Sequence, residues 1–218
     1  MKHFLLRIVS MIIGTLLYAL GIVFTLKANI GYAPWEVFHV GLADTIGLSI
    51  GVTAIIAGLI ILLIVTILGE KLGIGTIAST ILTGIFLDVI LYIHIIPVAN
   101  TVISGSIMMV IGLFIIALGS YFYIKSSFGV GPRDNLMVVL AKKTNVPVGM
   151  CRSIIELLVT TFGWFLGGMV GFGTILFVIA IGFCIQVTFK AFKFDVTTIK
   201  HESLIDTYLA LIGKKVLK

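Results

Sequence analysis

The sequence predicts an all-α integral membrane protein with six transmembrane helices, arranged as two inverted three-helix repeats. Three observations predict this fold class: the composition, the spacing of the apolar segments, and a similarity between the two halves of the chain. Of the 218 residues, 60% are hydrophobic and 11% are charged, and the mean hydropathy is +1.25. These values lie far outside those of a soluble domain of this length, so the expected surroundings of the chain are the lipid bilayer.

Six apolar segments are long enough to cross a bilayer, whose hydrocarbon core requires about 20 residues of helix. They cover residues 4–26, 49–69, 73–93, 102–124, 148–166 and 173–190. The first is too long for the apolar core of a signal peptide and no small-residue cleavage site follows it, so we expect it to be retained. Glycine-rich residues 167–173 favour a tight turn between the last two spans. Five spans, with one helix over 148–190, are the alternative.

The distribution of basic residues predicts the orientation of the chain. With the amino terminus in the cytoplasm, fourteen of the 15 Lys and Arg residues fall on the cytoplasmic side and only Lys27 falls outside. This asymmetry follows the positive-inside rule and accounts for the net charge of +6 without a nucleic-acid partner. We therefore expect both termini in the cytoplasm.

The two halves of the chain align without a gap from about residue 13 to residue 88 when one half is shifted by 98 positions. Residues 19–37, ALGIVFTLKANIGYAPWEV, then align with residues 117–135, ALGSYFYIKSSFGVGPRDN. Because each repeat contains three spans, the second enters the membrane from the opposite side. The expected domains are a first repeat over 1–98, an inverted second repeat over 99–193, and a cytoplasmic amphipathic tail over 194–218.

A short helix is expected to begin at the proline that ends a turn-rich loop in each repeat. Pro34 and Pro132 suit the first helical position, and Glu36 or Asp134 follows in the first turn, where a carboxylate complements the helix dipole. About a dozen residues separate each proline from the next turn, which corresponds to roughly 18 Å, or half a bilayer.

Two interpretations of these short helices stay open. As amphipathic helices lying flat in the interface, they would use their polar residues only as caps and headgroup contacts. As re-entrant half-helices, they would meet inside the membrane and present free N–H groups to an anion or a polar solute. In the second case the lining residues would be Glu36, His39, Arg133, Asp134 and Asn135.

Polar side chains within the spans are further candidates for a solute or ion pathway, because burying them is costly. Arg152 and Glu156 stand one turn apart in the fifth span and form either a structural ion pair or a proton or cation site. Asp88 and Gln186 occupy equivalent positions in the two repeats. They either share a site or each bond a neighbouring helix.

The other conspicuous residues have structural interpretations, and none indicates an enzyme or a cofactor. The histidines have no Cys or carboxylate partners at metal-ligand spacing, so no metal is expected. No base stands at a recognisable spacing from Ser153 or Cys151, which argues against nucleophilic catalysis. We expect Trp35 and Trp164 at the external surface as aromatic-belt residues, and the glycines of GIGT and GFGT at helix contacts.

Four sequences in combination resemble a family of bacterial membrane proteins. They are APWEVFHVGL (33–42), GIGTIASTILTGIFLD (73–88), GPRDNLM (131–137) and IELLVTTFGWFLGG (155–168). They resemble the YczE/YyaS/YitT proteins, most closely the YczE-like branch, with Glu36 standing where an aspartate is expected. The resemblance covers nearly the whole chain and implies a multipass protein of the bacterial inner membrane without a known cofactor. It implies no activity and no substrate.

The function that we expect is that of a small-solute transporter or permease with a pathway between the inverted repeats. The candidate pathway residues are Glu36, His39, Asp88, Arg133, Asp134, Asn135, Arg152, Glu156 and Gln186. The alternative is a non-transporting accessory or scaffold protein of the membrane. The solute is not specified by the sequence, and a homo-oligomer is compatible with it.

Overall fold

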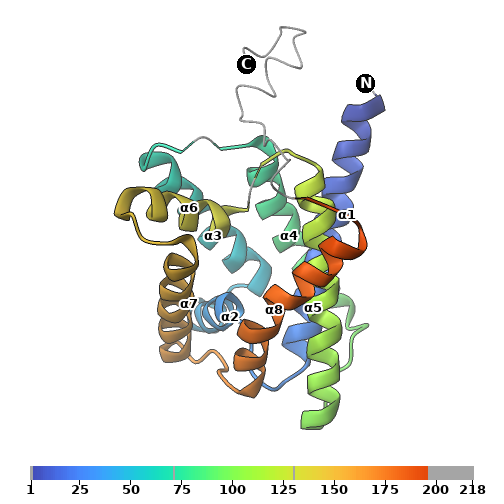
Figure 1. The fold of residues 1–218 in the computed structure, drawn as a ribbon. Coiled ribbons are helices and arrows are strands. Elements are labelled where there is room, and N and C mark those ends of the chain that lie inside the picture. The colour runs from blue at the N-terminus through green and yellow to red at the C-terminus, as the bar shows by residue number, and fades with distance from the viewer. Residues whose placement is uncertain (1, 71, 130, 196–218) are drawn as a thin grey trace, which may run out of the picture.

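The computed structural model describes residues 2–70, 72–129 and 131–195, and this part of the chain forms eight helices and no strand (Figure 1). Six helices are long and apolar enough to cross a membrane. They are α1 (Lys2–Lys27), α3 (Ile50–Ile67), α4 (Ile74–Ile93), α5 (Val102–Lys125), α7 (Val148–Phe165) and α8 (Phe172–Ala191). The protein is therefore an all-α multipass membrane protein, and the predicted spans are confirmed to within a few residues.

The five-span alternative is wrong, because the chain turns between α7 and α8. Gly167 adopts a φ of 96°, a left-handed conformation that glycine reaches without a steric penalty, directly after α7 ends. Two shorter helices of 13 residues each, α2 (Pro34–Ile46) and α6 (Pro132–Thr144), begin at the predicted prolines. The predicted amphipathic tail lies outside the described residues, apart from its first two positions.

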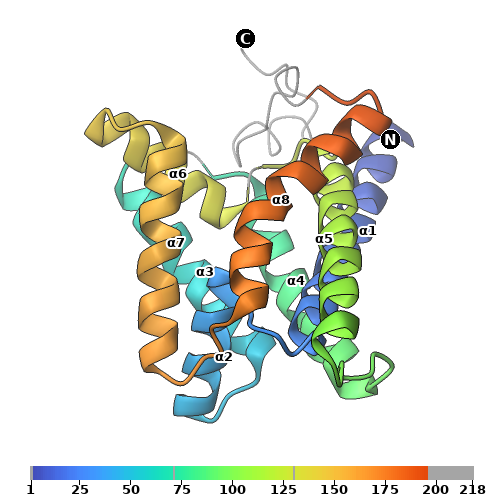
Figure 2. The ribbon, with the colours of Figure 1, turned by 60° about the horizontal axis from the view of Figure 1, so that its bottom comes forward.

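The spanning helices run between two faces of the molecule (Figure 2). The α6 face holds the start of α1 and the end of α6, and the opposite, α2 face holds the end of α1 and the loop 94–101. In that loop the Ala99 N–H donates to the Lys27 carbonyl oxygen at 2.8 Å, which ties the loop to the end of α1.

The eight helices divide into two groups, each with its own apolar core. The first bundle consists of α1, α4, α5 and α8, in which α1 and α5 pack against each other and carry α4 and α8 on their sides. The second bundle consists of α2, α3, α6 and α7. Figure 2 shows the second bundle beside the first. In the described part of the chain, α3 against α4 is the one extensive helix contact that joins the two bundles.

Glycines bring α1 and α5 into close contact in the first bundle. A side chain on Gly14 would collide with the backbone at Gly119, and a side chain on Gly21 would collide with the Gly112 carbonyl. Shifting by 98 positions exchanges these two contacts, because Gly14 then becomes Gly112 and Gly21 becomes Gly119. Such contacts between backbones are typical of membrane helix pairs with small residues at the interface.

A second exchanged pair of contacts holds the loops that precede α2 and α6. The Gly75 N–H donates to the Phe128 carbonyl at 3.0 Å, and the equivalent Gly173 N–H donates to the Ile30 carbonyl at 2.7 Å. A Cβ on Gly75 would collide with Phe128 and a Cβ on Gly173 would collide with the Gly31 carbonyl, so these glycines serve packing, mainly against the loops and not, as expected, between helices. Both exchanged pairs have the form that inverted repeats would produce, while the division into repeats over 1–98 and 99–193 stays a prediction.

Candidate functional site

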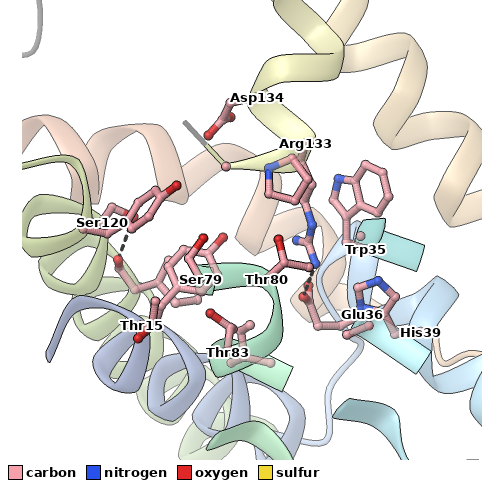
Figure 3. A pocket seen from close by; sticks show the side chains of 18 of the residues that line it. Thr15, Trp35, Glu36, His39, Ser79, Thr80, Thr83, Ser120, Arg133 and Asp134 are labelled. Atoms are coloured by element: carbon pink, nitrogen blue, oxygen red, sulfur yellow. Dashed lines mark hydrogen bonds and ion pairs between the residues drawn. The ribbon is translucent and has the colours of Figure 1, made fainter. Parts of the chain in front are cut away.

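A cavity of about 440 Å³ lies between the two bundles and is lined by residues of all eight helices (Figure 3). Its lining on α7 comes from Arg152 and Glu156, which stand in the half of that helix nearer the α6 face. Its lining on α5 comes from the last ten residues, which also approach the α6 face. The cavity therefore extends from the middle of the molecule toward the α6 face.

Both short helices begin at this cavity without a side-chain cap. Their N-cap residues are Ala33 and Gly131, neither of which supplies a hydrogen bond, whereas Ser49 and Thr101 cap α3 and α5. The first-turn N–H groups of a helix need acceptors, and together they carry a partial positive charge. The cavity therefore receives the positive ends of two helices.

An ion pair joins the starts of these two helices inside the molecule. Arg133 Nη2 lies 3.3 Å from Glu36 Oε1, and the side chain of Glu36 is only 4% exposed (Figure 3). Helices lying flat on opposite surfaces would be separated by the hydrocarbon core of about 30 Å. The contact between α2 and α6 therefore favours the re-entrant interpretation over the interfacial one.

Trp35 was expected at the external surface, and this prediction is wrong. The side chain is buried beside the cavity at 6% exposure. The reason is that α2 starts inside the bundle, so that its first turn has no contact with an interface. The Arg133 guanidinium lies 4.8 Å from the centre of the Trp35 ring. The buried Trp35 Nε1 has no hydrogen-bond partner among the described residues, although a buried N–H group ordinarily has one. Trp164, by contrast, is exposed.

His39 stands one turn beyond Trp35 and also lines the cavity. Its ring centre lies 6.2 Å from that of Trp35 (Figure 3). Its side chain is buried, with 3% exposure.

A second ion pair lines the cavity on α7. Arg152 Nε donates to Glu156 Oε1 at 2.8 Å, which confirms the predicted pairing along one helix face. Asp134 also lines the cavity, yet it is exposed and points away from the Glu36–Arg133 pair (Figure 3). The cavity thus combines two paired guanidinium groups with three carboxylates.

Three of the predicted pathway residues do not line the cavity. Asp88 bonds to the start of α3 instead, accepting from Ser49 Oγ at 2.5 Å and from the Gly51 N–H at 2.7 Å. Gln186 is exposed near the end of α8, and Asn135 is half-buried outside the lining. Asp88 and Gln186 do not share a site, because Asp88 lies toward the α2 face and Gln186 lies toward the α6 face. A two-fold axis in the membrane plane would place equivalent residues on opposite faces in this way.

Hydroxyl groups on the spans line the same cavity and were not predicted from the sequence. On α4 they are Ser79, Thr80 and Thr83, on α1 Thr15 and on α5 Ser120. The hydroxyls of Thr15, Thr80 and Ser120 donate to carbonyls of their own helices, which leaves oxygen lone pairs toward the cavity. The cluster of three hydroxyl residues within five positions of an otherwise apolar span was the signal available in the sequence.

Comparison with known proteins identifies relatives over most of the chain. The model of DUF6198, a family of unknown function, matches residues 5–190. The "Uncharacterized membrane protein YczE" of Bacillus subtilis is 31% identical over 175 residues, which cover 79% of this chain and 80% of that protein. An "Uncharacterized protein" of Haemophilus influenzae is 32% identical over 179 residues, covering 80% and 81%. The "Uncharacterized protein YyaS" of Bacillus subtilis is 30% identical over 182 residues, covering 80% and 88%.

These relatives confirm the resemblance to the YczE/YyaS/YitT proteins, since both the YczE and the YyaS proteins are among them. No solved structure matches the chain. The names of these relatives specify no substrate and no activity.

Proposed function

The chain belongs to DUF6198, a family of unknown function, and we propose that it is a transporter or permease for a small polar solute. The proposal is based on the cavity. The observation that carries the proposal is the contact of two half-helix starts, through Glu36 and Arg133, at a cavity between two bundles. Discontinuous helices that start at the middle of the membrane form the solute sites of many transporters. An enzymatic role is not part of the proposal.

The proposed architecture is a pair of inverted repeats with the cavity at their junction. It is supported by two contacts, Gly14 with Gly119 and Gly21 with Gly112, each of which corresponds to the other when positions are shifted by 98. The excess of Lys and Arg supports a cytoplasmic α6 face and both termini in the cytoplasm of a bacterium. In this orientation the cavity leads toward the cytoplasm.

The chemistry of the cavity favours a solute with both hydrogen-bond acceptors and donors. Trp35 Nε1 and the uncapped N–H groups of α2 and α6 require an oxygen acceptor, such as a carbonyl or a carboxylate. The hydroxyl oxygens and Asp134 accept hydrogen bonds in return. Three carboxylates against two guanidinium groups leave one negative charge, which disfavours a solute whose only charge is negative.

Thiol accessibility from each side of the membrane tests the proposal. In a variant carrying Cys151→Ser and Cys184→Ser, Thr80→Cys places one thiol in the cavity and Ile179→Cys places one on the exposed side of α8 as the control. A membrane-impermeant thiol reagent is applied to sealed vesicles of either orientation. A transporter exposes its cavity to both sides in turn, so we expect the cavity thiol, but not the control, to react from both.

Two results would contradict transport. Reaction of the cavity thiol from the α6 face alone would leave a hydrated cavity with no passage. Reaction from neither face would favour the accessory or scaffold protein, in which the cavity has no aqueous access.

A further inference from the structure

The contact between α3 and α4 closes the space between the two bundles near the α2 face. Gly51 and Gly84 pack so closely that a side chain on either would collide with the other helix. Asp88 adds two hydrogen bonds, from Ser49 Oγ and from the Gly51 N–H. We call this group of four residues, Ser49, Gly51, Gly84 and Asp88, the α3–α4 seam.

The equivalent contact between α7 and α8 is open. Shifting the four residues by 98 positions gives the α7–α8 seam, which consists of Pro147, Gly149, Gly182 and Gln186. No atom of another described element lies within 4 Å of the position that a Cβ on Gly149 or Gly182 would take. Helices α7 and α8 make no extensive contact within the described residues. The glycines that close one seam are therefore present but unused in the other.

The open seam lies at the side to which the cavity leads. Gly149 stands in the first turn of α7, near the α6 face, and the cavity residues Arg152 and Glu156 follow in the next two turns. The closed seam lies at the other end of the cavity, where Gly84 and Leu87 of α4 form part of the lining. Among the described residues, the α3–α4 seam is thus closed toward the α2 face, and the α7–α8 seam is open toward the α6 face.

We propose that the two seams exchange roles: the second bundle rocks against the first, closing α7 on α8 while α3 separates from α4. This inference rests on the proposed transport function, because it states how the cavity would open to the other side. The second bundle can move as a unit, since α3 against α4 is its one extensive helix contact with the first bundle in the described chain. In the exchanged state, Gly149 packs on Gly182 and its N–H donates to the Gln186 side chain.

The chemistry of the two seams explains which state the structure shows. Asp88 is a carboxylate and accepts two hydrogen bonds, whereas Gln186 would accept one as a neutral amide, and Pro147 has no hydroxyl to replace that of Ser49. Hydrogen bonds to a charged acceptor are stronger than those between neutral groups. The state with the α3–α4 seam closed is therefore the more populated one in the absence of solute.

Distances between spin labels on lipid-facing positions test the exchange. The pair Leu157→Cys and Ile179→Cys reports the α7–α8 seam, and the pair Leu59→Cys and Ile81→Cys, at the equivalent positions, reports the α3–α4 seam. Each pair is placed in the full chain carrying Cys151→Ser and Cys184→Ser and is measured in lipid nanodiscs without solute. We expect one short distance across α3–α4 and one long distance across α7–α8 as the main populations.

Weakening the α3–α4 seam should then change the distances of the two spin-label pairs in opposite directions. With Asp88→Asn, we expect the population with a long α3–α4 distance and the population with a short α7–α8 distance to increase together. The ratio of the exchanged state to the observed state should rise about tenfold, as the loss of a charge-assisted hydrogen bond implies. Ser49→Ala removes one hydrogen bond and should act in the same direction with a smaller effect, which provides a milder variant if Asp88→Asn fails to fold.

A blocking variant supplies the control. Gly182→Val adds a side chain where the structure has space, but this side chain would prevent α7 from closing on α8. Combining it with Asp88→Asn should therefore abolish the population with a short α7–α8 distance. A change at one seam without the opposite change at the other, or no change in any variant, would overturn the exchange.

The two experiments separate this inference from the proposed function. Exchange of the distances without thiol reaction from the α2 face would support the rocking motion and contradict transport. Thiol reaction from both faces without exchange of the distances would support transport and contradict the rocking motion.

Discussion

Helices α2 and α6 have the same length and begin with the same kind of turn, yet their packing differs. Seven residues of α2 are buried, including Trp35 and Glu36, whereas only Met137 and Val139 are buried in α6. The difference follows from the positions at which each helix meets its neighbour. Gly41 of α2 packs on Gly163 of α7, so the two backbones are in contact.

The positions equivalent to these glycines hold Val139 on α6 and Val65 on α3, which lie in the core of the second bundle. Two valines keep the helix backbones farther apart than two glycines do. The comparison teaches that the proline and the acidic residue specify where a half-helix starts, while the glycines specify how deeply it is held. Four pairs of variants would break or sharpen this comparison.

The largest effect is expected from Gly163→Val, which places a side chain against the backbone of Val37 and Phe38. Because neither backbone can move without displacing α2, we expect a loss of stability on the order of 3 kcal/mol or more and little folded protein. Size-exclusion profiles and the midpoint of thermal unfolding in detergent measure this. Gly182→Val, in open space, should unfold within a few degrees of the unsubstituted protein, and equal losses in both variants would contradict the role of the α2–α7 contact.

Glu36→Gln should have the next largest effect, because it leaves the Arg133 guanidinium without its carboxylate partner. Removing one member of a buried ion pair costs about 3–5 kcal/mol, and the partial exposure of Arg133 reduces this to about 2 kcal/mol. The unfolding midpoint should fall by about 4–8 °C. Asp134→Asn, at the equivalent but exposed position, should change stability by less than about 0.5 kcal/mol. A larger loss for Asp134→Asn than for Glu36→Gln would refute this assignment.

Val139→Ala tests the looser contact of α6. The removal of two buried methyl groups should cost about 1–2 kcal/mol, and the loss should be visible as a lower unfolding midpoint. Val138→Ala, at the neighbouring exposed position, is the control and should have almost no effect. If both variants unfold at the same temperature, then α6 does not depend on its contact with α3.

Trp35→Phe should have the smallest effect on stability, less than about 1 kcal/mol. The substitution reduces the ring volume but also removes a buried N–H group without a partner, and the two consequences act in opposite directions. The same unfolding measurement applies, with Trp164→Phe at the lipid-facing position as the control. A loss of more than about 2 kcal/mol would contradict this cancellation.

Part of the candidate site could be predicted from residue type alone. Glu36, Arg133 and Glu156 are charges next to or within apolar segments, and a membrane chain retains such residues only where they have partners or water. Trp35 could not be placed in this way, because an indole is equally typical of an interface and of a protein interior. The hydroxyl residues of α4 were equally ambiguous, since Ser and Thr can satisfy their own donors within a helix.

The sequence by itself determined the spans and the starts of α2 and α6, and it predicted the relation between the two halves of the chain. It could do so because a bilayer leaves the backbone few alternatives to the helix, and because a proline after a turn marks a helix start. Only the tertiary structure decided that α2 and α6 meet inside the molecule and that the cavity leads toward one face. The halves carry equivalent glycines at Gly51 and Gly149. Which of these glycines is in contact depends on how the two bundles pack, and a pattern shared by both halves cannot specify a difference between them.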